Sequence, residues 1–392
     1  MKGLASAFIE LFNKVAVYDK RLGIHNNGVD NNYPELVESR IANSVTALRC
    51  KNTMATFLSG KGFGDDLNQI IVNEKKELTL LQFTQDIADS IAEQNGVFIH
   101  MNYNLNFDIT TLEVLPFNDC RLSKTDDDKN NAKVLICTDW NDSKLAKKAR
   151  EVDIYNPKSS VIAAQIIKAK GIKKYNGQVY YFKLGKYTYP LAPIHPCLDD
   201  ADSEKQAGTY KNVSLRKGFF GKTLFVTKPM VDGNLDPETD AKEIQVQKTE
   251  RENFRGTIKK FVGAENVDGV MHIEMEMESD KLEDEILIKN IDANINDKLF
   301  AHTEGSVSEN ICVAYGVPPQ LIRPSDKGLF STSGEAIREM KIFYQDQTND
   351  ERMMVEQIVK KLMAKHVMKT AQELKIIPLI AEAPKTPEDV NN

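Results

Sequence analysis

Residues 308–340 read "SENICVAYGVPPQLIRPSDKGLFSTSGEAIREM", and the signals in this stretch set the prediction for the elements on either side. A helical pattern runs into Pro318 and Pro319, a turn-forming stretch follows, and a second helical pattern begins near Ser333. A proline removes an amide donor and disfavours the helical conformation for the residue before it. The two prolines therefore predict a helix break, followed by a connecting loop over residues 320–331.

Regular patterns continue on both sides of this break. After it, "TSGEAIREMKIFYQDQTNDERMMVEQIVKKLMAKHV" predicts one long amphipathic helix. Before it, Met271, Ile273, Met275 and Met277 alternate with polar residues and predict a strand with one buried face. Further upstream, "LDDADSEKQAGTYKNVSLRKGFF" and "AKEIQVQKTERENFRGTIKKFVG" predict two polar helices around a short strand, "KTLFVTKPM". Because these helices have few apolar positions, we expect neighbouring subunits to cover them.

The first half of the chain predicts helices packed beside an antiparallel sheet. Helical spacing over residues 36–57 ends at Gly60, and a further helix ends at Asn95 and Gly96, a pair typical of a left-handed C-terminal cap. Strand patterns follow in "VFIHMNYN", "ITTLEVLPFNDCRLSK", "KVLICTDW", "REVDIYNP" and "GQVYYFKLGKYTYPL". The predicted fold class is therefore α+β.

Length and composition indicate a folded protein of more than one unit. A single core stops growing at about 250–300 residues, and this chain has 392, of which 41% are hydrophobic and 28% charged. No window approaches the roughly 20 apolar residues of a membrane span. Glu10 and Lys14 interrupt the apolar N-terminal stretch, which therefore predicts an amphipathic helix rather than a secretory signal. We expect no membrane association and a location in the cytoplasm during synthesis.

Enzyme motifs have no support in the sequence. The five cysteines form no C-x-x-C pair, and the six histidines form no H-E-x-x-H pattern. "GKT" at residues 221–223 ends like a phosphate-binding loop, but Arg216 occupies the position of its first glycine. We therefore expect no catalytic residues, no metal and no cofactor. The acidic runs at residues 126–128 and 274–285 leave open a metal-dependent nuclease, although such runs are more often solvated surfaces.

Several segments, in order along the chain, resemble the portal proteins of tailed bacteriophages, which are head-to-tail connectors. "DIADSIAEQNGVFIHMNYNLNFDITTLEVLPFNDCRLSK" resembles a helix, turn and strand succession of that family. "FFGKTLFVTKPM" and "RENFRGTIKKFVGAENVDGVMHIE" are similar to its stem-to-clip segment and second stem helix. "ENICVAYGVPPQLI" is similar to its "I-A-x-x-F-G-V-P-P-x-L-L" element. Val267 and Asp268 before Gly269 depart from the smaller residues expected at the stem exit.

The resemblance implies a division of the chain into portal regions. Residues 1–198 would form a wing-like α+β domain, and residues 199–262 the stem helices, with a small clip at about 220–237. Residues 263–300 would return as strands of the wing. Residues 301–366 would hold the broken helix, a tunnel loop and the long C-terminal helix, and residues 367–392 a tail that is partly disordered.

The resemblance also implies a function. The chain would form a homo-oligomer, a dodecameric ring at the capsid portal vertex of the virion, assembled in the host cytoplasm. Double-stranded DNA would pass through it, weakly bound, because the net charge of −6 offers no broad surface for phosphates. Its partners would be the terminase large subunit, a head-tail adaptor and the major capsid protein. Another structural virion component, such as an adaptor or baseplate subunit, is the alternative.

Two groups of residues are implied as sites. The DNA-facing tunnel loop would contain Gln320, Arg323, Lys327 and Gly328, beginning after the helix break at Pro318 and Pro319. The partner-facing turn of the clip would contain Val231, Asp232 and Leu235. The loop could equally be an ordinary connection between helices with solvated charges.

Overall fold

The computed structural model describes residues 16–124, 133–217, 222–227, 270–274, 286–291, 297–323, 334–370 and 372–380. The chain divides into two compact units, one formed by Met1–Ala201 with Ser308–Asn392 and the other by Asp202–Val307. Residues 1–15 of the predicted N-terminal helix, the second polar helix and residues 381–392 of the predicted tail lie outside the described residues. Leu374 and Ile376, within the described part of that tail, are buried. Among the described helices, none combines the length and apolar character required to span a membrane.

A six-stranded sheet is the centre of the first unit. Its strands are β5 (Gly96–Tyr103), β6 (Ile109–Leu115), β7 (Cys120–Leu122), β8 (Lys133–Ile136), β9 (Arg150–Ile154) and β10 (Gln178–Lys183), in the order β6-β5-β10-β9-β8-β7. The hydrogen-bonded pairs described in this sheet are antiparallel except β9 and β10, which are parallel. The prediction of a purely antiparallel sheet was therefore wrong at this pair. Helix α7 (Ser159–Lys168) supplies the crossover that parallel strands need.

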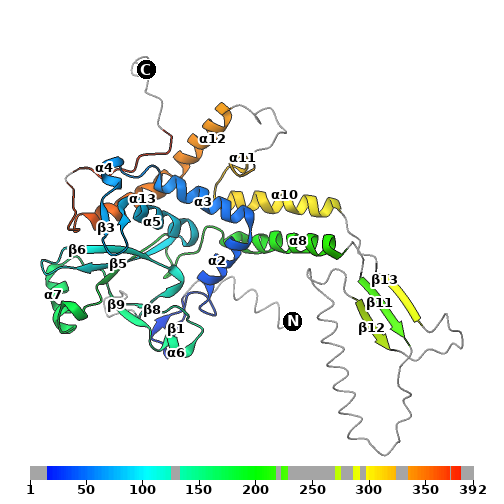
Figure 1. Cartoon of the computed structure of the whole chain (residues 1–392), viewed down its shortest axis with the longest axis horizontal. Coiled ribbons are helices and arrows are strands. Elements are labelled where there is room, and N and C mark those ends of the chain that lie inside the picture. The colour runs from blue at the N-terminus through cyan, green and yellow to red at the C-terminus, as the bar shows by residue number, and fades with distance from the viewer. Residues whose placement is uncertain are drawn as a thin grey trace, which may run out of the picture. The chain divides into compact units, whose positions relative to one another are not determined.

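Helices cover one face of this sheet (Figure 1). Helix α5 (Leu80–Gln94) packs on β5 and β6 and buries Phe83, Ile87 and Ile91 completely. A capping box between Thr79 and Gln82 begins the helix, and Asn95 ends it in the left-handed conformation, at φ 55°. The predicted cap at Asn95 is confirmed.

The other face of the sheet carries its own core. The buried members of this core are Phe98, Phe117, Cys120, Leu122, Val134, Val152, Val179 and Tyr189. The rings of Phe98 and Tyr181 stack with centroids 4.4 Å apart. Two short elements of the surrounding chain, β1 (Tyr18–Asp19) and β2 (Ile24–His25), form a hairpin, and β2 contacts β7.

The helix predicted over residues 36–57 is two helices. Helix α2 (Tyr33–Asn43) ends at Ser44, whose hydroxyl accepts a hydrogen bond from the amide of Ala47 and caps α3 (Val45–Ser59). Serine at this position satisfies one of the free amides at a helix start, so a new helix begins in a different direction. Helix α3 ends at Gly60, as predicted.

Short elements connect these parts. They are α4 (Asp65–Asn68), β3 (Ile71–Asn73), β4 (Leu78–Thr79), η1 (Phe117–Asp119), α6 (Ser143–Ala146), η2 (Ile172–Lys174) and η3 (His195–Cys197).

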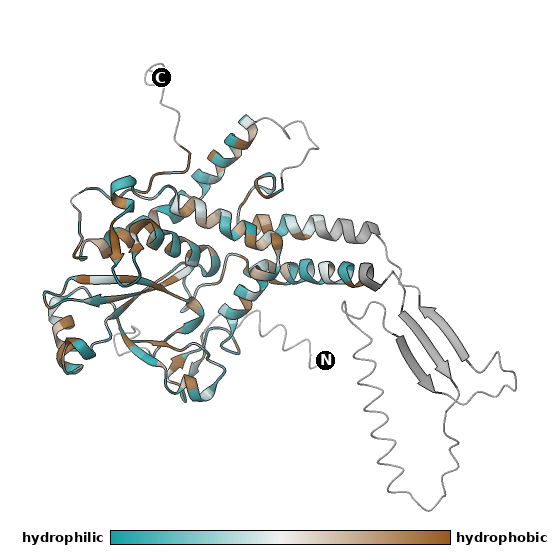
Figure 2. Cartoon of the chain, in the orientation of Figure 1, coloured by the Kyte–Doolittle hydropathy of each residue, from teal (hydrophilic) through white to brown (hydrophobic). Residues whose placement is uncertain are grey.

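The second unit contains a three-stranded sheet between two helices. Helix α8 (Leu198–Lys217) leads into it and α10 (Asp297–Ala314) leads out. Its strands are β11 (Lys222–Thr227), β12 (Val270–Glu274) and β13 (Ile286–Ile291), in the order β12-β11-β13. Strands β12 and β13 lie in residues 263–300, predicted as return strands of the wing, and both pair with β11. Figure 2 shows hydrophilic colours along most of α8.

The chain closes with three helices in the first unit. They are α11 (Pro319–Ile322), α12 (Gly334–Gln347) and α13 (Asn349–Met363). The single long C-terminal helix of the prediction is therefore divided at Thr348. The hydroxyl of Thr348 donates to the carbonyl of Tyr344 at 2.9 Å, a back-bond of the kind that bends helices. The mixture of helices and sheets confirms the α+β class.

Candidate functional site at the end of α10

Gly316 ends α10. It adopts φ +62°, its amide donates to the carbonyl of Val313, and the amide of Val317 donates to the carbonyl of Cys312. This pair of bonds is a Schellman motif, in which glycine is favoured because an L side chain is strained at positive φ. The buried Val317 and Cys312 provide the apolar contact that accompanies the motif. The helix therefore ends before the first proline is reached.

The two prolines begin the next helix. Pro318 is the residue before α11, and Pro319 occupies its first position, where the missing amide has no partner to lose. The amide of Arg323 donates to the carbonyl of Pro319 at 2.8 Å and closes the single turn. Gln320, predicted as the start of the loop, therefore lies in α11. The prolines separate two helices, but Gly316 supplies the stop.

The last part of α10 is held from two sides. On α3, the hydroxyls of Thr46 and Ser308 lie 3.4 Å apart, and the sulfurs of Cys50 and Cys312 lie 3.8 Å apart. On the other side, the amide of Asn310 donates to Asp200 at 3.1 Å near the start of α8. These contacts join residues more than a hundred positions apart in the sequence and fix the direction in which α10 enters the break.

Tyr344 of α12 completes the base of the site. Its side chain is fully buried, and its hydroxyl donates to the carbonyl of Tyr315 at 3.3 Å. Its ring meets that of Phe57 edge to face, with centroids 4.9 Å apart. Because α11 also packs against α3 and α12, both ends of the segment between Arg323 and Gly334 start from a packed base.

A charged group lies beneath this base. The ammonium of Lys51, whose side chain is 10% exposed, lies 2.5 Å from Asp89 and 3.8 Å from Glu93. Burial raises the pKa of the Glu93 carboxyl above its ordinary value, and burial also raises the pKa of the Tyr315 hydroxyl. Pairing compensates part of the cost of burying these charges, which fits a structural role in joining α3 to α5.

The structure describes some of the predicted site residues. Gln320 and Arg323 are exposed at the end of α11. Lys327 and Gly328 of the tunnel loop lie outside the described residues, and so do Val231, Asp232 and Leu235 of the clip. Gly316 and Tyr344 were missed as determinants of the break. The glycine could have been found, because glycine followed two residues later by proline is a helix-stop signal.

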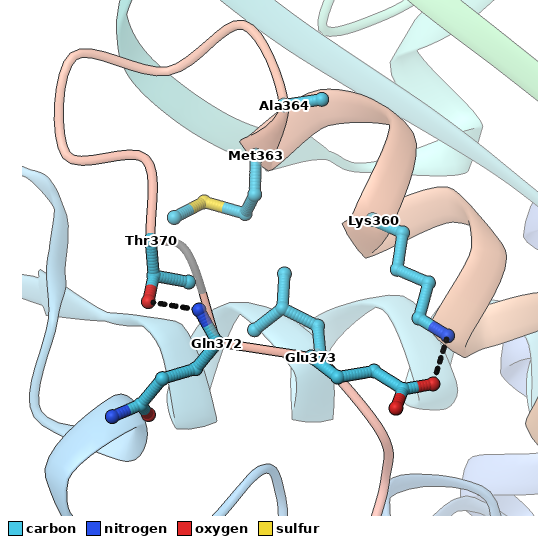
Figure 3. Close-up of a pocket in the computed structure, with 7 residues that line it drawn as sticks. Lys360, Met363, Ala364, Thr370, Gln372 and Glu373 are labelled. Carbon is cyan, nitrogen blue, oxygen red and sulfur yellow. Dashed lines mark hydrogen bonds and ion pairs between the residues drawn. The ribbon is translucent and has the colours of Figure 1, made fainter.

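Within the described residues, no group of three or more His, Cys, Asp or Glu side chains could hold a metal ion. An open pocket of about 260 Å³ lies elsewhere, between the end of α13 and residues 370 and 372–374 (Figure 3). Lys360 at its rim is already paired with Glu356 at 2.7 Å and with Glu373 at 3.9 Å. This pocket is therefore lined by satisfied charges and carries no recognisable chemistry.

Replacing Gly316 with alanine is expected to lower the free energy of unfolding by about 1 kcal/mol, because alanine is strained at this φ. The added Cβ would also meet the amide nitrogen of Gln347 at 2.4 Å. Gly305 in the same helix has open space around its Cβ position, so Gly305→Ala should stabilise by about 0.5–1 kcal/mol. Urea denaturation measures the change in the free energy of unfolding of each variant, which should be negative for Gly316→Ala and positive for Gly305→Ala. A neutral or stabilising Gly316→Ala would contradict this account of the break.

No protein-family model matches the chain, and no curated protein matches it either. Among solved structures, a chain from the virion of a native gene transfer agent particle shares 14% identity, covering 92% of this chain and 84% of that one, with a TM-score of 0.48. A chain from the neck of a native gene transfer agent particle, computed with C12 symmetry, shares 13%, covering 98% and 91%, with a TM-score of 0.48. An HK97 family phage portal protein from Corynebacterium diphtheriae shares 10%, covering 81% and 83%, with a TM-score of 0.37.

By name, these neighbours are virion, neck and portal structures. At this level of identity and with TM-scores below 0.5, the likeness assigns no function.

Proposed function

We propose that this chain is the subunit of a portal, a homo-oligomeric ring at a capsid vertex through which double-stranded DNA enters and leaves. The observation that carries the proposal is the break after α10. A glycine stop, a one-turn helix and a buried tyrosine prepare a rigid base on both sides of the segment that the portal resemblance assigns to the tunnel. The order of elements along the chain agrees with that resemblance.

Helix α8 also supports a ring. Helix α8 is predominantly polar, as Figure 2 illustrates, and a polar helix of 20 residues gains little by burial against its own chain. In a closed ring, each subunit is flanked by two copies of itself, which can bury such helices through repeated heterologous contacts. The proposal assigns α8 to this environment, together with the second polar helix predicted within residues 199–262.

Net charge supports the passage of DNA rather than its retention. A protein that neutralises many phosphates binds duplex DNA tightly, in a manner that depends steeply on salt. The chain carries a net charge of −6, so a ring of such subunits repels the duplex on average. Arg323 and Lys327 are proposed as the few cations that face the passage.

The partners follow from the same proposal. The clip turn with Val231, Asp232 and Leu235 would face the terminase large subunit during packaging and a head-tail adaptor afterwards, and the wing would lie against the major capsid protein. Catalysis is assigned to the motor and not to this chain. The ring is assembled in the host cytoplasm and remains in the virion.

The mass of the assembled protein tests the proposal. Light scattering of the purified full chain is expected to give a particle of about twelve times the 44.2 kDa chain mass, and imaging is expected to show an axial opening. A stable monomer at high concentration would refute the ring, and a particle without an opening would refute the passage. Magnesium-dependent cleavage of DNA would favour the nuclease alternative instead.

A further inference from the structure

The first unit carries a strongly basic segment in an acidic protein. Residues 154–198 contain seven lysines and no Asp, Glu or Arg. The remainder of the chain therefore has a net charge of −13, against −6 for the whole. A local excess of one sign this large creates its own field at the surface, so this segment can attract a ligand that the rest of the chain repels.

Five of these lysines lie together on α7, η2 and the turns beside them. We define the basic lobe as residues 156–178, with Lys158, Lys168, Lys170, Lys173 and Lys174, all exposed. Within the part of the chain that the structure describes, none of their ammonium groups forms an ion pair. Their charge is therefore available at the surface.

The lobe is held on a rigid base. The amide of Gln178, which is fully buried, donates to the side-chain oxygen of Gln165 at 2.8 Å, and the hydroxyl of Tyr175 donates to the same oxygen at 2.6 Å. The hydroxyl of Tyr103 donates to Gln178 at 2.7 Å and joins this network to the sheet. The lysines therefore extend from an ordered platform, which lowers the entropy cost of binding.

One lysine occupies a strained position. Lys170 has φ 61°, and Gly171, which follows it, donates its amide to the carbonyl of Ile166 at 3.0 Å in a Schellman motif. Glycine or asparagine is the usual residue at the left-handed position of this motif. A lysine there costs stability, and backbone strain of this kind is concentrated at functional positions.

We propose that the basic lobe binds double-stranded DNA through its phosphates, without reading base sequence. Five lysines with no acidic residue between them along the chain match the continuous negative charge of a duplex. A protein partner would need an apolar contact region. Among the described residues of α7, the only large apolar side chain that is exposed is Ile167, which is 77% exposed, so the lobe offers no such region. The inference deepens the proposed function, because it gives the ring a contact with its DNA outside the passage.

The position of the lobe fits a DNA contact outside the passage. Figure 1 shows α7 at the opposite end of the first unit from α11 and α12, with the sheet between them. If the α11–α12 side faces the passage, the lobe faces away from it. Duplex that is gripped there does not obstruct movement through the ring, so binding and sliding occur at different surfaces.

Salt dependence of DNA binding tests the lobe. Five phosphate contacts predict a slope of about −4.5 for the logarithm of the association constant against the logarithm of salt concentration, or a loss of about 500-fold between 50 and 200 mM salt. The probe is a fluorescently labelled 30-base-pair duplex of arbitrary sequence, titrated with the full-length protein. The lobe variant replaces Lys158, Lys168, Lys170, Lys173 and Lys174 with Gln.

The control variant makes the same change of charge elsewhere. It replaces five exposed lysines outside the lobe with Gln, namely Lys20, Lys61, Lys75, Lys147 and Lys369. The proposal predicts that the lobe variant loses about four units of slope while the control keeps the wild-type slope. Equal losses in both variants would overturn it, and so would the absence of binding at 50 mM salt. If the lobe bound poly-L-glutamate and did not bind the duplex, it would be assigned to an acidic protein partner, and the DNA proposal would also be overturned.

The outcome for the ring is read independently by light scattering on the same samples. A ring without the salt-dependent lobe binding refutes this inference alone. Lobe binding by a protein that stays monomeric refutes the ring and leaves the DNA site in place.

Discussion

Replacing Arg121 with methionine is expected to lower the free energy of unfolding of the first unit by about 3–5 kcal/mol, the usual cost of removing one partner from a buried, charged network. The Arg121 side chain is fully buried on β7. Its guanidinium donates to the side chain and carbonyl of Asn31 at 2.6 and 2.7 Å, and to Glu35 at 3.2 Å. Without it, the buried Asn31 carbonyl loses this donor, and the Asn31 side-chain oxygen keeps only the amide of Asn27, at 2.9 Å.

Two further contacts give this arginine its position. The guanidinium also donates to the carbonyls of Asn118 and Cys120, and its carbon atom lies 5.5 Å from the centre of the Trp140 ring. Lysine cannot reproduce this planar set of donors, so Arg121→Lys is expected to recover only part of the loss. Trp140 is the single tryptophan of the chain, and its fluorescence during urea denaturation therefore reports the unfolding of this region.

The control for this measurement is an exposed pair on the same sheet. Lys133 pairs with Glu151, and both side chains are at least one-third exposed. Lys133→Met should therefore change the free energy of unfolding by less than about 1 kcal/mol. A loss below about 1 kcal/mol for Arg121→Met would show that water or neighbouring groups replace the arginine, and would contradict its role as the link between β7 and the residues before α2.

Replacing Tyr344 with alanine is expected to cost about 3–5 kcal/mol, as for other large aromatic side chains removed from a core. Tyr344 fills the space between α3 and the end of α10, where it contacts the ring of Phe57 and the carbonyl of Tyr315. Its loss should loosen α11 and the start of α12 before the rest of the unit. Hydrogen exchange followed by mass spectrometry is expected to show faster exchange in residues 315–347, with little change in β5 and α5.

Two variants separate the contributions of Tyr344. Tyr344→Phe keeps the ring and removes the hydroxyl, and it should cost only about 1 kcal/mol, the usual net value of one hydrogen bond. Phe343→Ala removes the neighbouring ring, which is 64% exposed, and should change exchange little. If Phe343→Ala proved as damaging as Tyr344→Ala, α12 would be held by a different contact from the one described.

Local signals predicted much of the fold. The left-handed cap at Asn95, the end of α3 at Gly60 and the strand over Val270–Glu274 are in the structure at the predicted places. Each depends on residues within about one turn of the position concerned. The divisions at Ser44 and Thr348 were missed although the residue types that cause them are local, because apolar spacing continues across both positions and gives no sign of a change in direction.

The candidate site was predicted less completely. The sequence placed the break near the prolines, and a search for residues of one charge would also have found the basic lobe, because the absence of acids over residues 154–198 is visible in the sequence. It did not identify Tyr344, whose hydroxyl contacts the carbonyl of Tyr315, 29 positions away. Nor did it identify the contact between Cys50 and Cys312, which are 262 positions apart. Periodicity marks a residue as buried but does not name the residue against which it packs.

The sequence by itself determined the ends of several elements, such as α3 at Gly60 and α5 at Asn95, the charges that they carry, and that the chain has a mixed α+β fold. Only the tertiary structure decided that β9 and β10 run parallel, that β12 and β13 join β11, and that Arg121 is buried. The physical reason is the distance along the chain over which the deciding interactions act. Caps and turns are fixed by bonds within a few residues, whereas strand partners and buried charges are chosen by the free energy of packing the whole chain, which no short stretch contains.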